Sequence, residues 1–122
     1  MDLYNLRFVF IMLILDFAYI STIGNSLFSK TIRNIQNSNM KISYLGAFIS
    51  YILLIIALYY FIISKNASIM DAFVLGVVIY GVFDFTNIAL FLNYDIYTGI
   101  IDTLWGGILF SLTTFLYKIS EK

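Results

Sequence analysis

The chain has 122 residues and a formal net charge of zero; 61% of its residues are hydrophobic, 11% are charged, and its mean hydropathy is +0.94. Soluble domains have about 45–50% apolar and about 25% charged residues, so this composition indicates an integral, multi-pass membrane protein in contact with the lipid bilayer. Zero net charge argues against nucleic acid as a partner. The absence of cysteine and histidine removes disulfides, thiolate ligands, the usual zinc ligand and the usual general base, and we expect no cofactor.

Four apolar runs are each close to the roughly 20 residues that cross a bilayer. They lie at about Leu3–Ile23, Ile42–Ser64, Ala72–Leu92 and Tyr97–Tyr117. Inside a membrane such runs become helices, because every backbone polar group needs a partner. The two later connections are short and make neighbouring helices antiparallel. The sequence therefore predicts an all-α polytopic bundle of four antiparallel transmembrane helices, one membrane domain over residues 1–122, with both termini on one side.

The first span is interpreted as a retained transmembrane helix rather than a cleaved signal peptide. Arg7 precedes an apolar stretch that ends at Leu15, but Asp16 interrupts this stretch and no small-x-small cleavage site follows cleanly.

The connection after the first span predicts a short interfacial helix over Asn25–Gln36. Its apolar residues recur at helical spacing, and its two basic residues point elsewhere, a pattern typical of a helix that lies along the lipid headgroups. The apolar residues are Leu27, Phe28, Ile32 and Ile35, and the basic ones are Lys30 and Arg33. An irregular polar loop is the alternative, because Asn, Gln and Ser dominate the residues from Asn34 to Asn39.

The distribution of basic residues favours cytoplasmic termini by a margin of one residue. Arg7, Lys65, Lys118 and Lys122 lie on the side of the termini, and Lys30, Arg33 and Lys41 lie on the opposite side. Cytoplasmic loops carry the excess of Lys and Arg in most membrane proteins.

Each span carries one stripe of small or polar residues, with steps of three and four that keep the stripe on one helical face. The four stripes are Met12, Asp16, Tyr19 and Ile23; Ser43, Ala47, Ser50, Leu54 and Ala57; Gly76, Tyr80, Asp84, Asn87 and Phe91; and Thr98, Asp102, Trp105, Gly106, Leu109 and Thr113. We expect these stripes to face the interior. On the second span, Ile52, Ile55, Ile56 and Tyr59 are expected to face lipid.

Three aspartates, Asp16, Asp84 and Asp102, lie inside the apolar spans. A carboxylate at that depth is costly unless it faces the bundle interior and has a partner. Because the chain alternates direction, all three are displaced from mid-span towards the same side, by roughly 3–8 Å at 1.5 Å per residue. The sequence therefore predicts one acidic pocket in one half of the bilayer, without a basic residue at that depth, whose carboxyls titrate as a coupled set.

The polar neighbours of these aspartates complete the candidate site. Asn87 follows Asp84 by one helical turn and is a further candidate for binding an ion or solute. Tyr19, Tyr80 and Tyr94 are candidate hydrogen-bond donors to the carboxyls. The indole of Trp105 is expected to donate to Asp102, one turn earlier on the same span. The alternative for every member is a structural one, in which hydrogen bonds only hold the helices together.

The motifs around these residues resemble a family of small membrane proteins, the domain-of-unknown-function family 2177, found in bacteria and in some large DNA viruses. The resemblance rests on Leu15–Asp16 with Tyr19–Ile20, on Tyr80–Ala89 with its Asp-x-Thr-Asn-x-Ala pattern, and on Asp102–Gly107 with its Asp-x-x-Trp-Gly pattern. It implies a four-helix membrane protein and no established activity. The residues that match the motif positions are Asp16, Asp84, Thr86, Asn87, Asp102, Trp105 and Gly106. The short, Ile- and Asn-rich chain fits a viral member better than a typical bacterial one.

Three functions from different classes follow from these observations. The first is the passage of protons, cations or a small solute through the acidic pocket; four short helices leave little room for alternating access, an objection that a homo-oligomer would relieve. The second is a structural or assembly role in a membrane, for example that of a virion, in which the aspartates only hold helices together. The third, which ranks last, is an enzyme with Asp and Asn oxygens on a divalent metal. The sequence predicts no catalytic residue.

Overall fold

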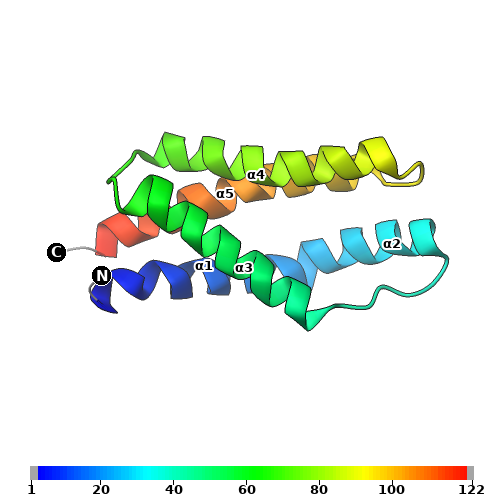
Figure 1. Ribbon diagram of the computed structural model, residues 1–122, viewed down its shortest axis with the longest axis horizontal. Helices are drawn as coiled ribbons and strands as arrows, with labels where there is room; N and C mark the ends of the chain where they lie inside the picture. Colours follow the sequence, from blue (N-terminus) through cyan, green and yellow to red (C-terminus); the bar gives the residue numbers. More distant parts are fainter. Residues whose placement is uncertain (1–2, 121–122) are drawn as a thin grey trace.

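The computed structural model describes residues 3–120, which form four long helical segments joined by three connections (Figure 1). All four segments are long and apolar enough to cross a membrane: Tyr4–Gln36, Tyr44–Ile63, Ile69–Leu90 and Ile96–Ser120, with mean hydropathies of 1.9, 2.4, 1.9 and 1.4. The described ends of the chain lie at the same end of the bundle (Figure 1). The predicted fold class, an antiparallel bundle of four membrane-spanning helices, is confirmed.

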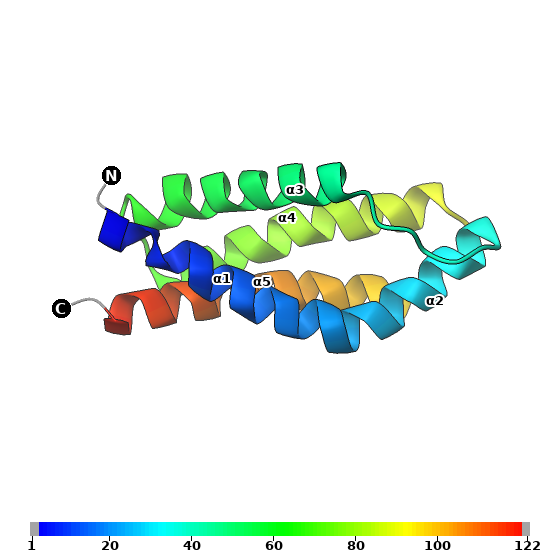
Figure 2. The ribbon, with the colours of Figure 1, turned by 90° about the horizontal axis from the view of Figure 1, so that it is seen from below.

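The first segment is continuous from Leu3 to Gln36. It consists of η1 (Leu3–Leu6), α1 (Arg7–Tyr19), the π-helical turn η2 (Ile20–Gly24) and α2 (Asn25–Gln36). The segment changes direction where α1 gives way to α2 (Figure 2), as π-helical turns commonly cause. The helix predicted over Asn25–Gln36 is therefore present as a continuation of the first span, and its placement along the headgroups stays a prediction.

The π-helical turn changes which residue faces inward. The sequence stripe placed Ile23 in the interior, but Ile23 is 56% exposed and Gly24 is buried. A π turn contains one residue more than an α turn, so beyond it the residue that faces the interior lies one position later in the sequence. The shifted register continues into α2, whose buried residue Thr31 shares a 2.9 Å hydrogen bond with Thr98.

The second segment consists of α3 (Tyr44–Leu58) and the π-helical turn η3 (Tyr59–Ile63). Ser43 is its N-cap, since the Ser43 hydroxyl accepts a 3.2 Å hydrogen bond from the Gly46 amide. The segment runs obliquely past its neighbours and forms one edge of the bundle (Figures 1 and 2).

The inward face of this second segment differs from the predicted stripe. Ser43 and Ser50 are exposed, whereas Leu58 and Ile62 are fully or almost fully buried. Of the residues expected to face lipid, Ile52 and Ile56 are exposed, but Ile55 and Tyr59 pack against the core. Leu54 of the predicted stripe also packs against the core, so the prediction is confirmed in part, and the covered face extends to Ile55 and Tyr59.

The remaining helices, α4 (Ile69–Leu90) and α5 (Ile96–Ser120), form the closest pair of the bundle. Ser68 and Asp71 form a capping box at the start of α4, so Asp71 has a purely local role there. The two backbones touch at glycines: a Cβ built on Gly76 would lie 2.1 Å from the Gly106 carbonyl oxygen. The predicted stripe of α5 is confirmed, since Thr98, Asp102, Gly106, Leu109 and Thr113 are all buried.

Arg7 joins the two described ends of the chain. Its guanidinium donates to the Ser120 hydroxyl at 2.6 Å and to the Tyr117 carbonyl oxygen at 3.0 Å, and it lies 4.0 Å from the centroid of the Tyr117 ring. A cation at a helix C-terminus is favourable because the last carbonyl groups lack helical partners. This contact fixes α1 against α5, and Phe8, Met12, Leu109 and Phe110 are buried in the core beyond it.

Candidate functional site

The three intramembrane aspartates lie close to one another inside the bundle. Asp16 lies in the last turn of α1, Asp84 in the second half of α4, and Asp102 near the start of α5. Their exposed fractions are 4%, 0% and 5%. The three residues are buried inside the bundle, as the sequence predicts; their depth in a membrane and their function stay predictions.

Helices α1 and α5 exchange hydrogen bonds through two side-chain pairs. Trp105 donates its indole N–H to Oδ1 of Asp16 at 2.9 Å, and Tyr19 donates its hydroxyl to Oδ1 of Asp102 at 3.1 Å. The two rings stack, with centroids 4.6 Å apart and planes inclined by 5°. On each helix the aromatic residue follows the aspartate by three positions, so two antiparallel helices bring each aspartate to the aromatic residue of the other.

Gly24 supports the position of Tyr19. A Cβ built on Gly24 would lie 2.9 Å from Cε2 of the Tyr19 ring. The π-helical turn thus places a residue without a side chain beside the ring that donates to Asp102.

Asp84 accepts two hydrogen bonds. The hydroxyl of Tyr94 donates to Oδ1 at 3.1 Å, and the hydroxyl of Thr103 donates to Oδ2 at 3.3 Å. Tyr94 lies in the connection between α4 and α5, where burial raises the pKa of its hydroxyl above the usual range, so it stays a donor at neutral pH. The side chains of Asp84 and Asp102 also interact directly.

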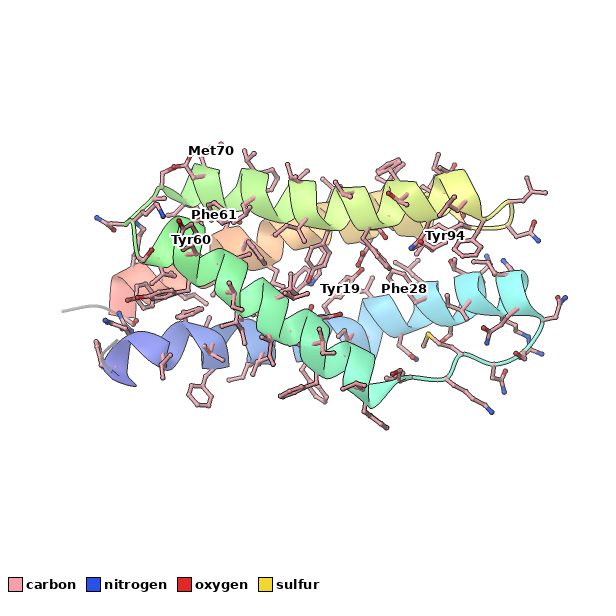
Figure 3. The ribbon with its side chains drawn as sticks, in the orientation of Figure 1. Tyr19, Phe28, Tyr60, Phe61, Met70 and Tyr94 are labelled. Carbon is pink, nitrogen blue, oxygen red and sulfur yellow. The ribbon has the colours of Figure 1, made fainter. Side chains whose placement is uncertain are left out.

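These contacts define the acidic cluster, which consists of Asp16, Asp84 and Asp102. Two of its members belong to a series of interacting hydroxyl and carboxyl groups, Tyr19, Asp102, Asp84 and Tyr94, which runs from the interior to the α4–α5 connection. Figure 3 shows Tyr94 at that end of the molecule and Tyr19 near its middle. Hydroxyl and protonated carboxyl groups both donate and accept hydrogen bonds, so such a series is able to transfer a proton.

A cleft of about 530 Å³ lies beside the acidic cluster. Asp16 and Asp102 are two of its lining residues, together with Tyr19 and Tyr80. Helices α1 to α5 all contribute to it, and most of the lining side chains are apolar. In Figure 3, Tyr19 and Phe28, both of which line the cleft, point from the first segment towards the α4–α5 pair.

The other predicted site residues lie at different distances from the cluster. Tyr80 lines the cleft, and no hydrogen bond of its hydroxyl is present among the described residues. Asn87 is half-buried and its side chain interacts with the Tyr94 hydroxyl. Thr86 is exposed, so its side chain does not join the cluster. Gly106 is buried against Gly76 and Tyr80 and serves helix packing.

Two contacts differ from the sequence expectation. The indole of Trp105 donates to Asp16 and not to Asp102, because the partner lies across the interface rather than one turn away on the same helix. Tyr51, which the sequence did not single out, donates its hydroxyl to Oδ2 of Asp16 from α3. Tyr51 is one position from Ser50 in the predicted stripe, and no other signal distinguishes it among ten tyrosines.

Residues 3–120 contain no group of three or more acidic, histidine or cysteine side chains that is arranged to hold a metal ion. The carboxyl oxygens instead accept hydrogen bonds from Tyr51, Trp105, Tyr19, Tyr94 and Thr103. This arrangement gives the divalent-metal interpretation no support.

Comparison with known proteins gives one match. No curated protein and no solved structure matches the chain. One family matches residues 2–118, almost the full length, and it is described as a predicted membrane protein family, DUF2177. This match agrees with the resemblance seen in the Asp16, Asp84 and Asp102 motifs and with the four helices that are able to span a membrane. The chain is therefore an integral membrane protein that belongs to the DUF2177 family.

Proposed function

We propose that this protein passes protons or a small cationic solute across its membrane by way of the acidic cluster. The observation that carries the proposal is the series Tyr19, Asp102, Asp84 and Tyr94, in which hydroxyl and carboxyl groups interact from the cleft to the α4–α5 connection. Every member is 7% exposed or less. Buried ionisable residues of this kind in membrane helices commonly mark ion or proton pathways.

The lack of basic side chains in the cleft beside the cluster, among the residues that the structure describes, supports this proposal. None of the residues that line the cleft is a lysine or an arginine. A carboxylate that is buried without a cationic partner is costly, so it either holds a proton or binds a cation from outside. An exchange between these two states is the chemistry that coupled passage requires.

The test is flux into proteoliposomes under an imposed membrane potential, followed with an entrapped pH dye. The protein is expected to admit protons or a supplied monovalent cation, and Asp84→Asn is expected to abolish this flux while it leaves the protein folded. Asp71→Asn is the matched control, because Asp71 lies in an exposed capping box and an amide oxygen still accepts the Ser68 amide hydrogen. Flux through Asp84→Asn equal to that of the unmodified protein would refute the proposal.

A structural or assembly role in a cellular or virion membrane is the second candidate. The observation that favours it is that Asp16 receives hydrogen bonds from both α3 and α5, through Tyr51 and Trp105. In this role the aspartates only hold the helices together. Asp84→Asn would then impair folding or assembly, and the unmodified protein would give no flux.

For the first candidate, passage of protons or a small cation, four helices leave little room for alternating access. Passage is therefore proposed to take place in a homo-oligomer.

A further inference from the structure

The cleft beside the acidic cluster has the size and the walls of a site for an organic molecule. Its volume is about 530 Å³, within the roughly 300–1,000 Å³ that is usual for ligand pockets. Its lining residues come from all four helical segments, and the apolar side chains include Ile20, Phe28, Leu53, Leu54, Ile79 and Phe83. A surface of this kind binds hydrocarbon rather than a hydrated ion.

The charged groups of the cleft favour a positive charge, and its other polar side chains, such as Asn25 and Ser50, are neutral. The polar groups include the carboxyls of Asp16 and Asp102 and the hydroxyl of Tyr80, and the lining residues include no basic side chain. The Tyr80 hydroxyl has no hydrogen-bond partner among the described residues, and Tyr80 lines the cleft together with Asp16 and Asp102. Cations are also attracted to the faces of aromatic rings, which Tyr19 and Phe28 supply here.

The rim of the cleft is accessible from the outside of the bundle. Leu53 of α3 is 60% exposed and Phe83 of α4 is 54% exposed, although both line the cleft. In a membrane, the outer surfaces of these helices contact lipid. A hydrophobic molecule dissolved in the bilayer therefore reaches the cleft without passing through water.

We propose that the cleft binds a lipophilic organic cation, an ammonium or phosphonium centre with alkyl or aryl groups. Its charge lies beside Asp16 and Asp102, and its hydrocarbon contacts the apolar walls. A neutral lipid chain would leave these two carboxyls facing hydrocarbon, which is unfavourable. A bare metal ion is disfavoured, because no three acidic side chains among the described residues are arranged to hold one. The inference rests on the proposed function and names the class of solute.

Binding of radiolabelled tetraphenylphosphonium to the purified protein in detergent tests this inference. We expect saturable binding that alkylammonium ions compete for, and more strongly as their chains lengthen. Tetraphenylborate, which has the same shape and the opposite charge, is expected neither to bind at the site nor to compete. Equal competition by the anion would overturn the charge assignment.

Two pairs of variants locate the site. Asp102→Asn is expected to weaken binding at least tenfold, and Asp71→Asn is expected to leave it unchanged. Leu53→Trp fills the cleft from its rim without altering the acidic cluster, and it is expected to abolish binding. Leu104→Trp is its control, because Leu104 is 50% exposed on α5 and does not line the cleft. Unchanged binding to a folded Leu53→Trp variant would refute the site.

The same measurements separate this inference from the proposed function, because binding is measured without transport. Saturable, cation-selective binding without any flux would support the site and refute passage. Proton flux that depends on Asp84, without tetraphenylphosphonium binding, would refute the organic-cation site and leave proton passage supported.

Discussion

Trp105 of α5 donates its indole N–H to the carboxyl of Asp16 on α1, at 2.9 Å. A second hydrogen bond connects the same two helices in the opposite direction: the hydroxyl of Tyr19 on α1 donates to the carboxyl of Asp102 on α5. The rings of Trp105 and Tyr19 stack on each other, so the two hydrogen bonds and the ring contact lie at the same place on the α1–α5 interface. This exchange connects the first and last helices of the chain at the depth of the acidic cluster, and the cluster therefore depends on both.

Replacing the indole is expected to destabilise the protein. Trp105→Phe keeps a ring that is able to stack on Tyr19 but removes the donor to Asp16. Hydrogen bonds between membrane helices contribute about 0.5–2 kcal/mol, and the free energy of unfolding should fall by about that amount. Reversible unfolding in mixed micelles with increasing sodium dodecyl sulfate measures the change.

Tyr97→Phe is the control for the indole prediction. Tyr97 is 70% exposed on the same helix, so removal of its hydroxyl should leave the free energy of unfolding unchanged. If Trp105→Phe and Tyr97→Phe unfold at the same detergent ratio, the Trp105–Asp16 hydrogen bond does not contribute to stability.

Removing the Tyr51 hydroxyl is expected to loosen α3. Tyr51→Phe deletes the hydrogen bond from α3 to Asp16, while the apolar contacts of Leu58 and Ile62 near the other end of this segment remain. Backbone amides in the first half of α3 should then exchange faster with deuterated solvent, because local opening becomes more frequent. Mass spectrometry of peptides from purified protein resolves this change.

The expected signature of the Tyr51 substitution is its confinement to one helix. Amides of α4 and α5 should exchange as in the unmodified protein, and Tyr44→Phe should change nothing, because Tyr44 is 82% exposed. Faster exchange throughout the molecule would show that the hydroxyl supports the bundle as a whole, contrary to this prediction.

The glycine contact between α4 and α5 is expected to tolerate no side chain. In Gly76→Ala the new Cβ would lie 2.1 Å from the Gly106 carbonyl oxygen, so the two backbones must separate. Overpacking of this kind costs about 1–3 kcal/mol and sometimes more. The yield of monodisperse protein and its melting temperature in detergent should both fall.

Gly46→Ala is the matched control for the glycine contact. A Cβ at Gly46 meets only the Ser43 side chain, at 3.5 Å, and alanine favours a helix by up to about 1 kcal/mol over glycine. The control should therefore melt at the same temperature or slightly higher. A Gly76→Ala protein that melts with the control would show that α4 and α5 do not pack through their glycines.

Helix α2 is expected to have one face in water and one face against the protein. The chain has no cysteine, so a single introduced cysteine is the only site that a maleimide labels. Lys30→Cys and Arg33→Cys should react with a membrane-impermeant maleimide in proteoliposomes, because both positions are exposed. Thr31→Cys should stay unlabelled until the protein is denatured, since Thr31 is 0% exposed. Labelling of Lys30→Cys only after detergent is added would place α2 inside the bilayer.

Several features of this protein follow from its sequence alone. Apolar length predicts four spans, and short connections predict that they are antiparallel. The period of α5 predicts its buried face from Thr98 to Thr113. The alternating chain direction and the positions of Asp16, Asp84 and Asp102 in their spans predict that the three residues lie close to one another. These properties depend on the lengths of the apolar runs and on the spacing of residues within each run, both of which can be read from the sequence.

Only the tertiary structure decided which residues meet across the helices. Because of the π-helical turn, Gly24 rather than Ile23 lies on the inner face of the first segment. On α3, which runs obliquely, Tyr51 rather than Ser50 donates a hydrogen bond to Asp16. Trp105 met Asp16 instead of Asp102. A one-residue change rotates a helical face by about 100°, and local periodicity does not fix the rotation of one helix against another. That rotation is determined by side-chain packing between segments far apart in the chain.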